Sequence, residues 1–288
     1  MKELDSIKSA LFMPATKSDF VAKAHKTGAD AIILDLEDSI AVDQKISARE
    51  CIQGASAEIA NQGLVVMVRI NSEWRLAVRD LETSIGKNVQ CIIVPKASSE
   101  EHIKIIDEIV TELEMEKGLT IGSTKLLAFI ESPSALDKAH SIAAASARLV
   151  GLSLGTEDFS TVVGAKPNRA TLYAPCQQII FAAYSAGIRA FGFPDSIANF
   201  ADVEGFRETI KLSRDMGFRG ACCIHPTQVK IINQEFSPSA EEIQDAVAIV
   251  SNFENAQKNG SAAIAYKGQM IDAPVYARAK RLLETINS

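Results

Sequence analysis

Short apolar stretches alternate with longer amphipathic stretches along most of the chain. Eight runs are rich in Val, Ile and Leu with little polar alternation, which is typical of strands buried on both faces of a parallel sheet. They are Ser9–Met13, Ala31–Leu36, Leu64–Ile70, Cys91–Val94, Leu126–Ile130, Leu149–Leu154, Ile188–Phe193 and Gly220–Ile224. Helical patterns lie between them, for example Phe20–Thr27, Gln44–Ala60, Glu100–Glu116, Ala135–Ala145, Leu172–Ala186 and Val203–Met216.

This succession predicts an α/β fold, a closed (β/α)8 TIM barrel over residues 1–235. The rival fold is a doubly wound open sheet. It usually carries fewer such units, and its Gly-x-Gly-x-x-Gly signature does not follow the first run here. The length of 288 residues fits one barrel with a short appendage.

The pattern changes after about residue 235. Ile243–Asn255 is amphipathic, Tyr266–Gln269 has the composition of a turn, and Ala273–Thr285 predicts a last helix. A segment of roughly 50 residues is too small to bury a core of its own. We therefore expect residues 236–288 to form a helical lid or oligomerisation segment that packs on the barrel or on a neighbouring subunit.

The composition of the chain limits the kinds of ligand and cellular environment that we expect for it. The net charge of −6 disfavours a nucleic-acid phosphate backbone as a ligand, although a metal or a few local cations can still hold a small anion. The five cysteines are odd in number and form no Cys-x-x-Cys pair, so we expect neither a disulfide framework nor a zinc site. No apolar run approaches the ~20 residues of a membrane span. A cytoplasmic protein is expected.

Charged residues follow most of the apolar runs, where a TIM barrel carries its chemistry. We expect these residues to converge on one face of the barrel. They are Lys17, Glu37, Asp38, Arg69, Lys96, Glu131, Glu157, Asp158, Asp195 and His225.

Glu131 and Asp158 follow consecutive runs, so their strands are expected to be neighbours. Two carboxylates completed by water and ligand oxygens suit Mg²⁺, a hard ion. The alternative is that each acid caps the helix that follows it.

Three other side chains allow more than one role. Arg69 can grip a substrate carboxylate with two hydrogen bonds, or pair with Glu37 or Asp38, and both can hold together. Lys96 can form a Schiff base, but an anion-binding or ion-paired lysine is the commoner case. A structural role is favoured for His225, which precedes a proline.

Eight short motifs, seven of them at strand ends, resemble the citrate lyase β-subunit family within the HpcH/HpaI aldolase superfamily. The resemblance extends from about residue 9 to residue 284. The motifs are Leu11–Pro14, Ile33–Ser39, Val68–Asn71, Val94–Lys96, Ile130–Ser132, Leu154–Asp158, Cys223–Gln228 and Gly268–Pro274.

The resemblance implies a carbon–carbon lyase. Such an enzyme cleaves a carboxylated 3-hydroxyacyl-CoA of the citryl-, malyl- or citramalyl-CoA type into an acyl-CoA and a 2-oxo acid. It implies Mg²⁺ on Glu131 and Asp158, substrate contact by Arg69, and a homotrimer or hexamer. Asp272 is implied to act as acid or base, reaching a neighbouring subunit's site from the lid.

The candidate residues fall into three sets. The catalytic set is Asp272, Arg69, Glu37 and Asp38, and the metal set is Glu131 and Asp158. The substrate-binding set is Arg69, Gly155, Thr156, Glu157, Lys17 and Lys96.

The sequence departs from the family in two loops. Ala15–Lys17 and Phe193–Ser196 differ from the usual family residues, which leaves the nucleotide contacts and the substrate choice open. Two other functions stay open. One is a CoA-independent aldolase acting on pyruvate and an aldehyde. The other is an obligate lyase subunit whose substrate is carried on an acyl-carrier partner.

Overall fold

The computed structural model describes residues 4–287, and the chain divides after Phe236 into two compact units. The first unit, Met1–Phe236, contains the eight long apolar runs. The second, Ser237–Ser288, contains the C-terminal segment. The role of the second unit as a lid or oligomerisation segment stays a prediction.

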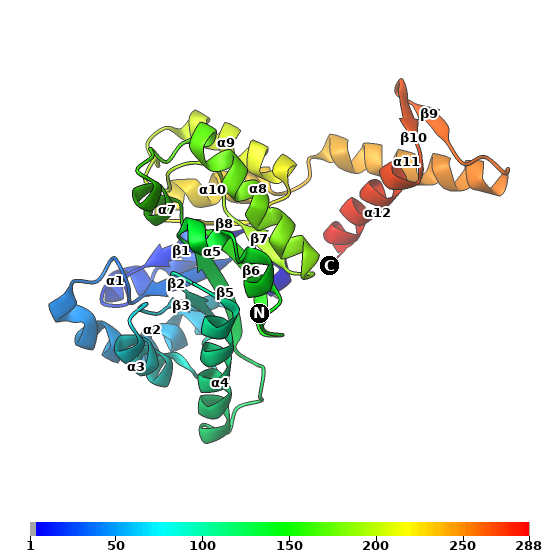
Figure 1. The fold of residues 1–288 in the computed structure, drawn as a ribbon. Helices are drawn as coiled ribbons and strands as arrows, with labels where there is room; N and C mark the ends of the chain where they lie inside the picture. The colour runs from blue at the N-terminus through cyan, green and yellow to red at the C-terminus, as the bar shows by residue number, and fades with distance from the viewer. Residues whose placement is uncertain (1–3, 288) are drawn as a thin grey trace. The chain divides into compact units, whose positions relative to one another are not determined.

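Eight parallel strands make up the sheet of the first unit, in the order β7-β6-β5-β4-β3-β2-β1-β8 (Figure 1). Their bounds are β1 Ser9–Met13, β2 Ala31–Asp35, β3 Val65–Arg69, β4 Cys91–Val94, β5 Lys125–Ile130, β6 Leu149–Leu154, β7 Arg189–Phe191 and β8 Ala221–Cys223. Sequential strands are neighbours because each returns through a helical crossover on the outside. The predicted TIM barrel is confirmed.

Two backbone hydrogen bonds connect β7 and the residue after it to the two residues that precede β8. The amide of Arg219 donates to the carbonyl of Ala190 at 3.0 Å, and the amide of Gly192 donates to the carbonyl of Gly220 at 2.9 Å. Both strands are three residues long, shorter than the sequence pattern predicted. Gly192 has a φ of 136°, which only glycine adopts readily, and the chain leaves the strand there.

Helices surround the strands of this unit (Figure 1). They are the 3-10 helices η1 Leu4–Ser6, η2 Ala24–Thr27 and η3 Val42–Gln44, and the α-helices α1 Ser18–Val21, α2 Lys45–Asn61, α3 Trp74–Ser84, α4 Glu100–Glu116, α5 Pro133–Leu136, α6 Ala139–Ala143, α7 Thr156–Val163, α8 Arg169–Ser185, α9 Val203–Met216 and α10 Pro226–Glu235. Within the described residues, the structure contains no helix with the length and apolarity needed to cross a membrane.

Two helices predicted from the sequence are interrupted. Phe20–Thr27 is divided between α1 and η2, and Ala135–Ala145 between α5 and α6. The second region also starts earlier than predicted, because the Ser132 hydroxyl accepts the amide of Ala135 at 3.3 Å and Pro133 suits a first turn. Helices this short gain few backbone hydrogen bonds for the cost of starting them, so local turns compete.

Buried apolar side chains form two clusters in the first unit. The first includes Ile33, Met67, Ile93 and Phe129, all from strands, and fills the barrel interior. The second combines strand residues such as Ile32 with helix residues, and lies between the sheet and the helices. Successive strand residues point to opposite faces, which explains why Ile32 and Ile33 belong to different clusters.

The second unit contains two helices that pack on each other, α11 Ala240–Lys258 and α12 Ala273–Asn287. The rings of Phe253 and Tyr276 stack with their centroids 4.9 Å apart. The Ser239 hydroxyl accepts the amide of Glu242 at 3.1 Å and so caps the start of α11.

A two-stranded antiparallel hairpin connects these helices, whereas the sequence pattern predicted only a turn there. β9 Ile264–Tyr266 pairs with β10 Gln269–Ile271. Lys267 and Gly268 both have a positive φ, 48° and 78°, as in the tightest hairpin turns. The predicted turn is confirmed, but three-residue strands carry too little alternation to be recognised in the sequence. The hairpin strands are thus an addition to the predicted helices and turn of this segment.

Candidate functional site

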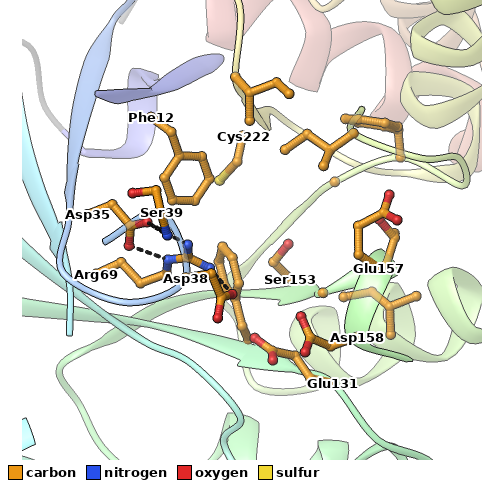
Figure 2. Close-up of a pocket in the computed structure, with 18 residues that line it drawn as sticks. Phe12, Asp35, Asp38, Ser39, Arg69, Glu131, Ser153, Glu157, Asp158 and Cys222 are labelled. Atoms are coloured by element: carbon orange, nitrogen blue, oxygen red, sulfur yellow. Dashed lines mark hydrogen bonds and ion pairs between the residues drawn. The ribbon is translucent and has the colours of Figure 1, made fainter. Parts of the chain in front are cut away.

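A cavity of about 370 Å³ lies where the barrel strands end. Its polar lining consists of Asp35, Asp38, Ser39, Arg69, Glu131, Ser153, Thr156, Glu157 and Asp158. Its apolar lining consists of Phe12, Phe129, Leu154, Phe193, Ile197, Cys222 and Ile224. Figure 2 shows Phe12 and Cys222 on the side away from Glu131 and Asp158. Glu131 and Asp158 are thus separated from these two side chains within the cavity.

Glu131 and Asp158 lie together in this cavity, as the sequence predicted (Figure 2). Glu131 follows β5 and Asp158 lies in the first turn of α7, directly after β6. The Nζ atom of Lys96 is 4.0 Å from Glu131 Oε2 and 3.9 Å from Asp158 Oδ1, so the two carboxylates share one cation.

Neither acid caps the helix that follows its strand. The Ser132 hydroxyl caps α5, and the residue before α7 is Gly155, which makes no side-chain cap. The alternative that Glu131 and Asp158 serve as helix caps is therefore wrong. Their carboxylates remain available to a ligand.

The environment of Glu131 is suited to a divalent cation. Its Oε2 atom is buried and accepts no hydrogen bond. Burial, together with the charges of Glu37 and Asp158, raises the pKa of Glu131 to about 8. A buried, unsatisfied carboxylate beside a second carboxylate is an oxygen donor set that Mg²⁺ would complete.

Two protein ligands would leave most of the coordination shell to other oxygen atoms. Among the described residues, no group of three or more His, Cys, Asp and Glu side chains is arranged to hold a metal ion. Mg²⁺ commonly binds one or two carboxylates and fills its remaining positions with water and substrate. The pair of carboxylates fits that pattern.

Gly155 leaves room for the carboxylate of Glu131. A Cβ atom at Gly155 would lie 2.4 Å from Glu131 Cγ and 2.9 Å from Glu131 Cδ. The amide of Gly155 also donates to the carbonyl of Ile130 at 2.9 Å, which holds the two loops in register. The sequence suggested that Gly155 binds substrate. The structure adds a role in spacing the first candidate metal ligand.

Arg69, at the end of β3, is surrounded by acids. Its Nε and Nη2 atoms donate to the two carboxylate oxygens of Asp35 at 2.7 and 2.8 Å, and Nη1 lies 3.0 Å from Glu37 and 3.3 Å from Asp38. Arg69 also lies over the ring of Phe12, 4.8 Å from its centroid. The predicted pairing with Glu37 and Asp38 is present, within a larger cluster.

Sequence reasoning missed Asp35, the main partner of Arg69. Burial would raise the pKa of Asp35, but the hydrogen bonds and charge of Arg69 outweigh it, so the pKa is lowered. The available signal was an acid inside an otherwise apolar strand, since a buried carboxylate requires a partner. Asp35 holds the guanidinium in place at the cavity.

Glu37 links the two cations of the site. It lies 3.0 Å from Arg69 Nη1 and accepts a hydrogen bond from Lys96 Nζ at 2.6 Å. Burial raises the pKa of Glu37, although both cations oppose the shift. Lys96 is therefore an ion-paired lysine here, the commoner of the roles considered for it.

Other candidates lie around or away from the cavity. Thr156 and Glu157 line it, and Glu157 accepts a hydrogen bond from the Ser196 hydroxyl at 2.6 Å. Lys17 is exposed and is not among the lining residues. His225 begins α10, where its Nδ1 atom accepts the amide of Thr227 at 3.3 Å, a structural role.

Asp272 belongs to the second unit. Its Oδ1 atom accepts the amide of Val275 at 3.3 Å and its carbonyl accepts the amide of Tyr276 at 2.9 Å, so it begins α12. Its expected role as an acid or base at a neighbouring subunit's site stays a prediction.

The family model described as HpcH/HpaI aldolase/citrate lyase matches residues 8–226. The chain belongs to this family. The match covers the barrel of the first unit and each of the cavity residues described above. The resemblance expected from the eight motifs is confirmed.

Several members of the HpcH/HpaI family are similar over almost the whole chain. The citrate lyase subunit beta of Haemophilus influenzae is 34% identical and covers 98% of this chain and 97% of its own. The (3S)-malyl-CoA thioesterase of Cereibacter sphaeroides strain KD131 is 33% identical and covers 92% of this chain and 89% of its own.

A solved member of the family has the same fold. The crystal structure of CitE from Mycobacterium tuberculosis, in complex with magnesium, acetoacetate and coenzyme A, has a TM-score of 0.80 to this chain and 28% identity. The superposition covers 99% of this chain and 100% of the other. The aligned region therefore includes residues of both units. Full-length homologues at this identity support a lyase.

Proposed function

We propose that this protein is a Mg²⁺-dependent carbon–carbon lyase for carboxylated 3-hydroxyacyl-CoA thioesters. Its products would be an acyl-CoA and a 2-oxo acid. The observation that carries the proposal is the pair of Glu131 and Asp158 at one cavity, with Glu131 Oε2 buried and without a hydrogen bond. Support also comes from the relative solved with magnesium, acetoacetate and coenzyme A.

Glu131 and Asp158 are the residues that would hold the ion. When bound, Mg²⁺ supplies a Lewis acid for the hydroxyl and carboxylate oxygens of a substrate. Gly155 keeps the space that the Glu131 carboxylate needs. Asp158, with 42% of its side chain exposed, is the ligand more accessible to an entering ion.

Arg69 would orient a substrate carboxylate, and its positive charge would stabilise the negative charge that forms during the reaction. Asp35 fixes the guanidinium of Arg69 through two hydrogen bonds, and the guanidinium keeps further N–H groups for a substrate carboxylate. Cleavage of the bond between C2 and C3 of the 3-hydroxyacyl thioester leaves its electron pair on C2 as the thioester enolate, and prepositioned positive charge lowers the cost of forming it. The apolar lining residues Phe129, Phe193 and Ile197 would exclude water from that enolate.

Proton removal from the substrate hydroxyl requires a base. Asp272 is our candidate, on the strength of its place in the family's C-terminal motif. It would act once the second unit covers a barrel mouth. Glu37 and Asp38 would set the position of Arg69 rather than exchange protons.

The test is an assay of the purified full-length protein with citryl-, malyl- and citramalyl-CoA, with and without Mg²⁺, followed by mass spectrometry. We expect an acyl-CoA and a 2-oxo acid from at least one ester, only with Mg²⁺. Asp158→Ala should abolish turnover and remain folded. The matched control Asp215→Ala removes an exposed acid of α9 and should retain turnover.

Other product patterns would contradict the proposal. Free CoA with an intact hydroxy acid would indicate thioester hydrolysis, the activity named for the Cereibacter relative. Turnover only with an acyl-carrier thioester would indicate an obligate subunit. Absence of CoA binding in calorimetry, with turnover of pyruvate and an aldehyde, would indicate a CoA-independent aldolase.

A further inference from the structure

Lys96 occupies an unusual position between the candidate metal ligands and the acids around Arg69. It follows β4 and has a φ of 47°, in the left-handed region that residues other than glycine rarely adopt. Among the described residues, the other non-glycine residue with a positive φ is Lys267, in a hairpin turn. A strained backbone thus directs the Lys96 side chain into the site.

The ammonium group of Lys96 is surrounded by four carboxylates. Its Nζ atom is 2.6 Å from Glu37 Oε1 and 3.8 Å from Asp38 Oδ1. It is also 4.0 Å from Glu131 Oε2 and 3.9 Å from Asp158 Oδ1. The hydrogen bond to Glu37 and the three further acids favour the charged form of this ammonium group.

The other cation of the site is already committed elsewhere. Arg69 is bound by Asp35, Glu37 and Asp38. In the part of the chain that the structure describes, Lys96 is the cation that forms ion pairs with both Glu131 and Asp158. Its ammonium group therefore lies within 4.0 Å of both candidate metal ligands, in the space beside the proposed ion.

The same charge would oppose the metal. An Mg²⁺ ion lies about 2.1 Å from a ligand oxygen. If it binds Glu131 Oε2 and Asp158 Oδ1, its distance from Lys96 Nζ is at most about 6 Å, because Nζ is 3.9 Å from Asp158 Oδ1. At that distance, repulsion between a doubly charged ion and an ammonium group changes a binding constant about tenfold, even with the dielectric constant of water.

We infer that Lys96 is a resident counter-ion of the metal site. It holds the metal-free carboxylates together and weakens the binding of Mg²⁺ through direct charge repulsion. The inference rests on the proposed magnesium site. It makes Lys96 a positioning residue that sets the affinity for the ion, beyond the substrate contact expected from the sequence.

Isothermal titration of the full-length protein with Mg²⁺, without substrate, tests this inference. Lys96→Met keeps an unbranched side chain one atom shorter than lysine but removes the charge, and should bind Mg²⁺ about tenfold more tightly at low salt. Lys96→Arg keeps the charge and should stay within about threefold of the wild type. Repulsion is screened by salt, so the ratio between Lys96→Met and the wild type should shrink at high ionic strength.

A merely structural lysine would give the opposite result. Weaker or unchanged Mg²⁺ binding by Lys96→Met, in protein that melts like the wild type, would overturn the inference. If Lys96→Met does not fold, Lys96→Gln replaces it and must show the same tightening. Absence of Mg²⁺ binding by the wild type would instead contradict the proposed function, so the two failures are distinguishable.

Discussion

At the scale of single residues, Gly155 leaves the space that the side chain of Glu131 occupies where β5 and β6 end. A methyl group there would overlap Glu131 Cγ at 2.4 Å. We predict that Gly155→Ala displaces the Glu131 carboxylate and weakens Mg²⁺ binding at least tenfold. We also expect it to lower the free energy of unfolding by about 1–3 kcal/mol, the usual cost of overpacking. Magnesium titration and urea unfolding measure the two effects.

The control for this change is Gly54→Ala, in the middle of α2. A Cβ atom at Gly54 meets nothing within 4 Å, and Gly54 is exposed. Alanine favours a helix interior by about 0.5–1 kcal/mol over glycine, so this variant should be slightly more stable and bind Mg²⁺ normally. Normal Mg²⁺ binding by Gly155→Ala would contradict the spacing role of Gly155.

Residue-scale chemistry was only partly accessible from the sequence. Glu131, Asp158 and Arg69 were predictable because each follows an apolar run, and parallel strands bring those positions to one edge. Asp35 was not, because it lies inside the run and its partner is 34 positions away. Which carboxylate pairs with Arg69 depends on the direction of the side chains. The pattern of apolar positions does not give that direction.

At the scale of elements, a buried ion pair anchors the connection between α4 and β5. Glu114 accepts the amides of Gly122 and Thr124, each at 2.7 Å, and lies 2.8 Å from Arg148. Burial would raise the pKa of Glu114, but Arg148 and the two amides outweigh it and hold the pKa at about 2. The loop before β5, the strand that leads to the proposed metal ligand Glu131, is thus fixed by one carboxylate.

This arrangement predicts a pH dependence of stability. The pKa of Glu114 falls from 4.5 in an unfolded chain to about 2 in the fold. Its contribution of roughly 3 kcal/mol is therefore present above about pH 4.5 and is lost as the pH falls toward 2. Glu114→Gln should lower the free energy of unfolding by at least that amount at pH 7, because Arg148 is left buried without its partner.

Urea unfolding at pH 7, 4.5 and 3 checks this prediction. The difference between the wild type and Glu114→Gln should narrow as the pH falls. Glu112→Gln, an exposed neighbour on α4, should differ from the wild type by less than about 0.5 kcal/mol at each pH. A difference between the wild type and Glu114→Gln that is the same at all three pH values would contradict the assigned pKa.

Element boundaries show where the sequence pattern stops being informative. Long strands such as β5 and long helices such as α4 were predicted within a residue or two, because their apolar repeats span several turns or pleats. The break between α5 and α6 and the β9–β10 hairpin were not. Each involves three to five residues, and local hydrogen bonds rather than burial decide their conformation.

At the scale of the whole molecule, the proposed reaction divides its groups between two units. The metal ligands belong to the first unit and Asp272 to the second. We predict that Asp272→Asn lowers kcat at least 100-fold and leaves the Kd for Mg²⁺ unchanged. Asparagine can still accept the amide of Val275, so α12 keeps its start.

Steady-state kinetics and magnesium titration of the same preparation decide this point. Asp245→Asn, in α11, is the matched control. It removes an ion pair with Lys267 within the second unit and should retain turnover. Wild-type kcat in Asp272→Asn would show that the proton is removed by a group of the barrel itself.

The barrel was predictable from the spacing of its strands. The way in which the two units cooperate was not. Eight buried runs separated by helices leave few topologies open. The sequence of the second unit does not restrict its role in the same way. Its helices have exposed faces, and the pattern of apolar positions does not identify the surface on which they pack.

The short junction between β7 and β8 has a consequence for how this architecture diversifies. Two backbone hydrogen bonds and one from the Arg189 side chain to the carbonyl of Arg219 connect the strands there, whereas β5 and β6 are paired at five positions. The lining residues Phe193 and Ile197 follow β7, at the weakly connected junction. Glu131 and Asp158 follow β5 and β6, which are paired more extensively. Substitutions at Phe193 and Ile197 can therefore change which substrate fits the cavity without displacing Glu131 and Asp158. Substrate selectivity can change in this way while the proposed chemistry is kept.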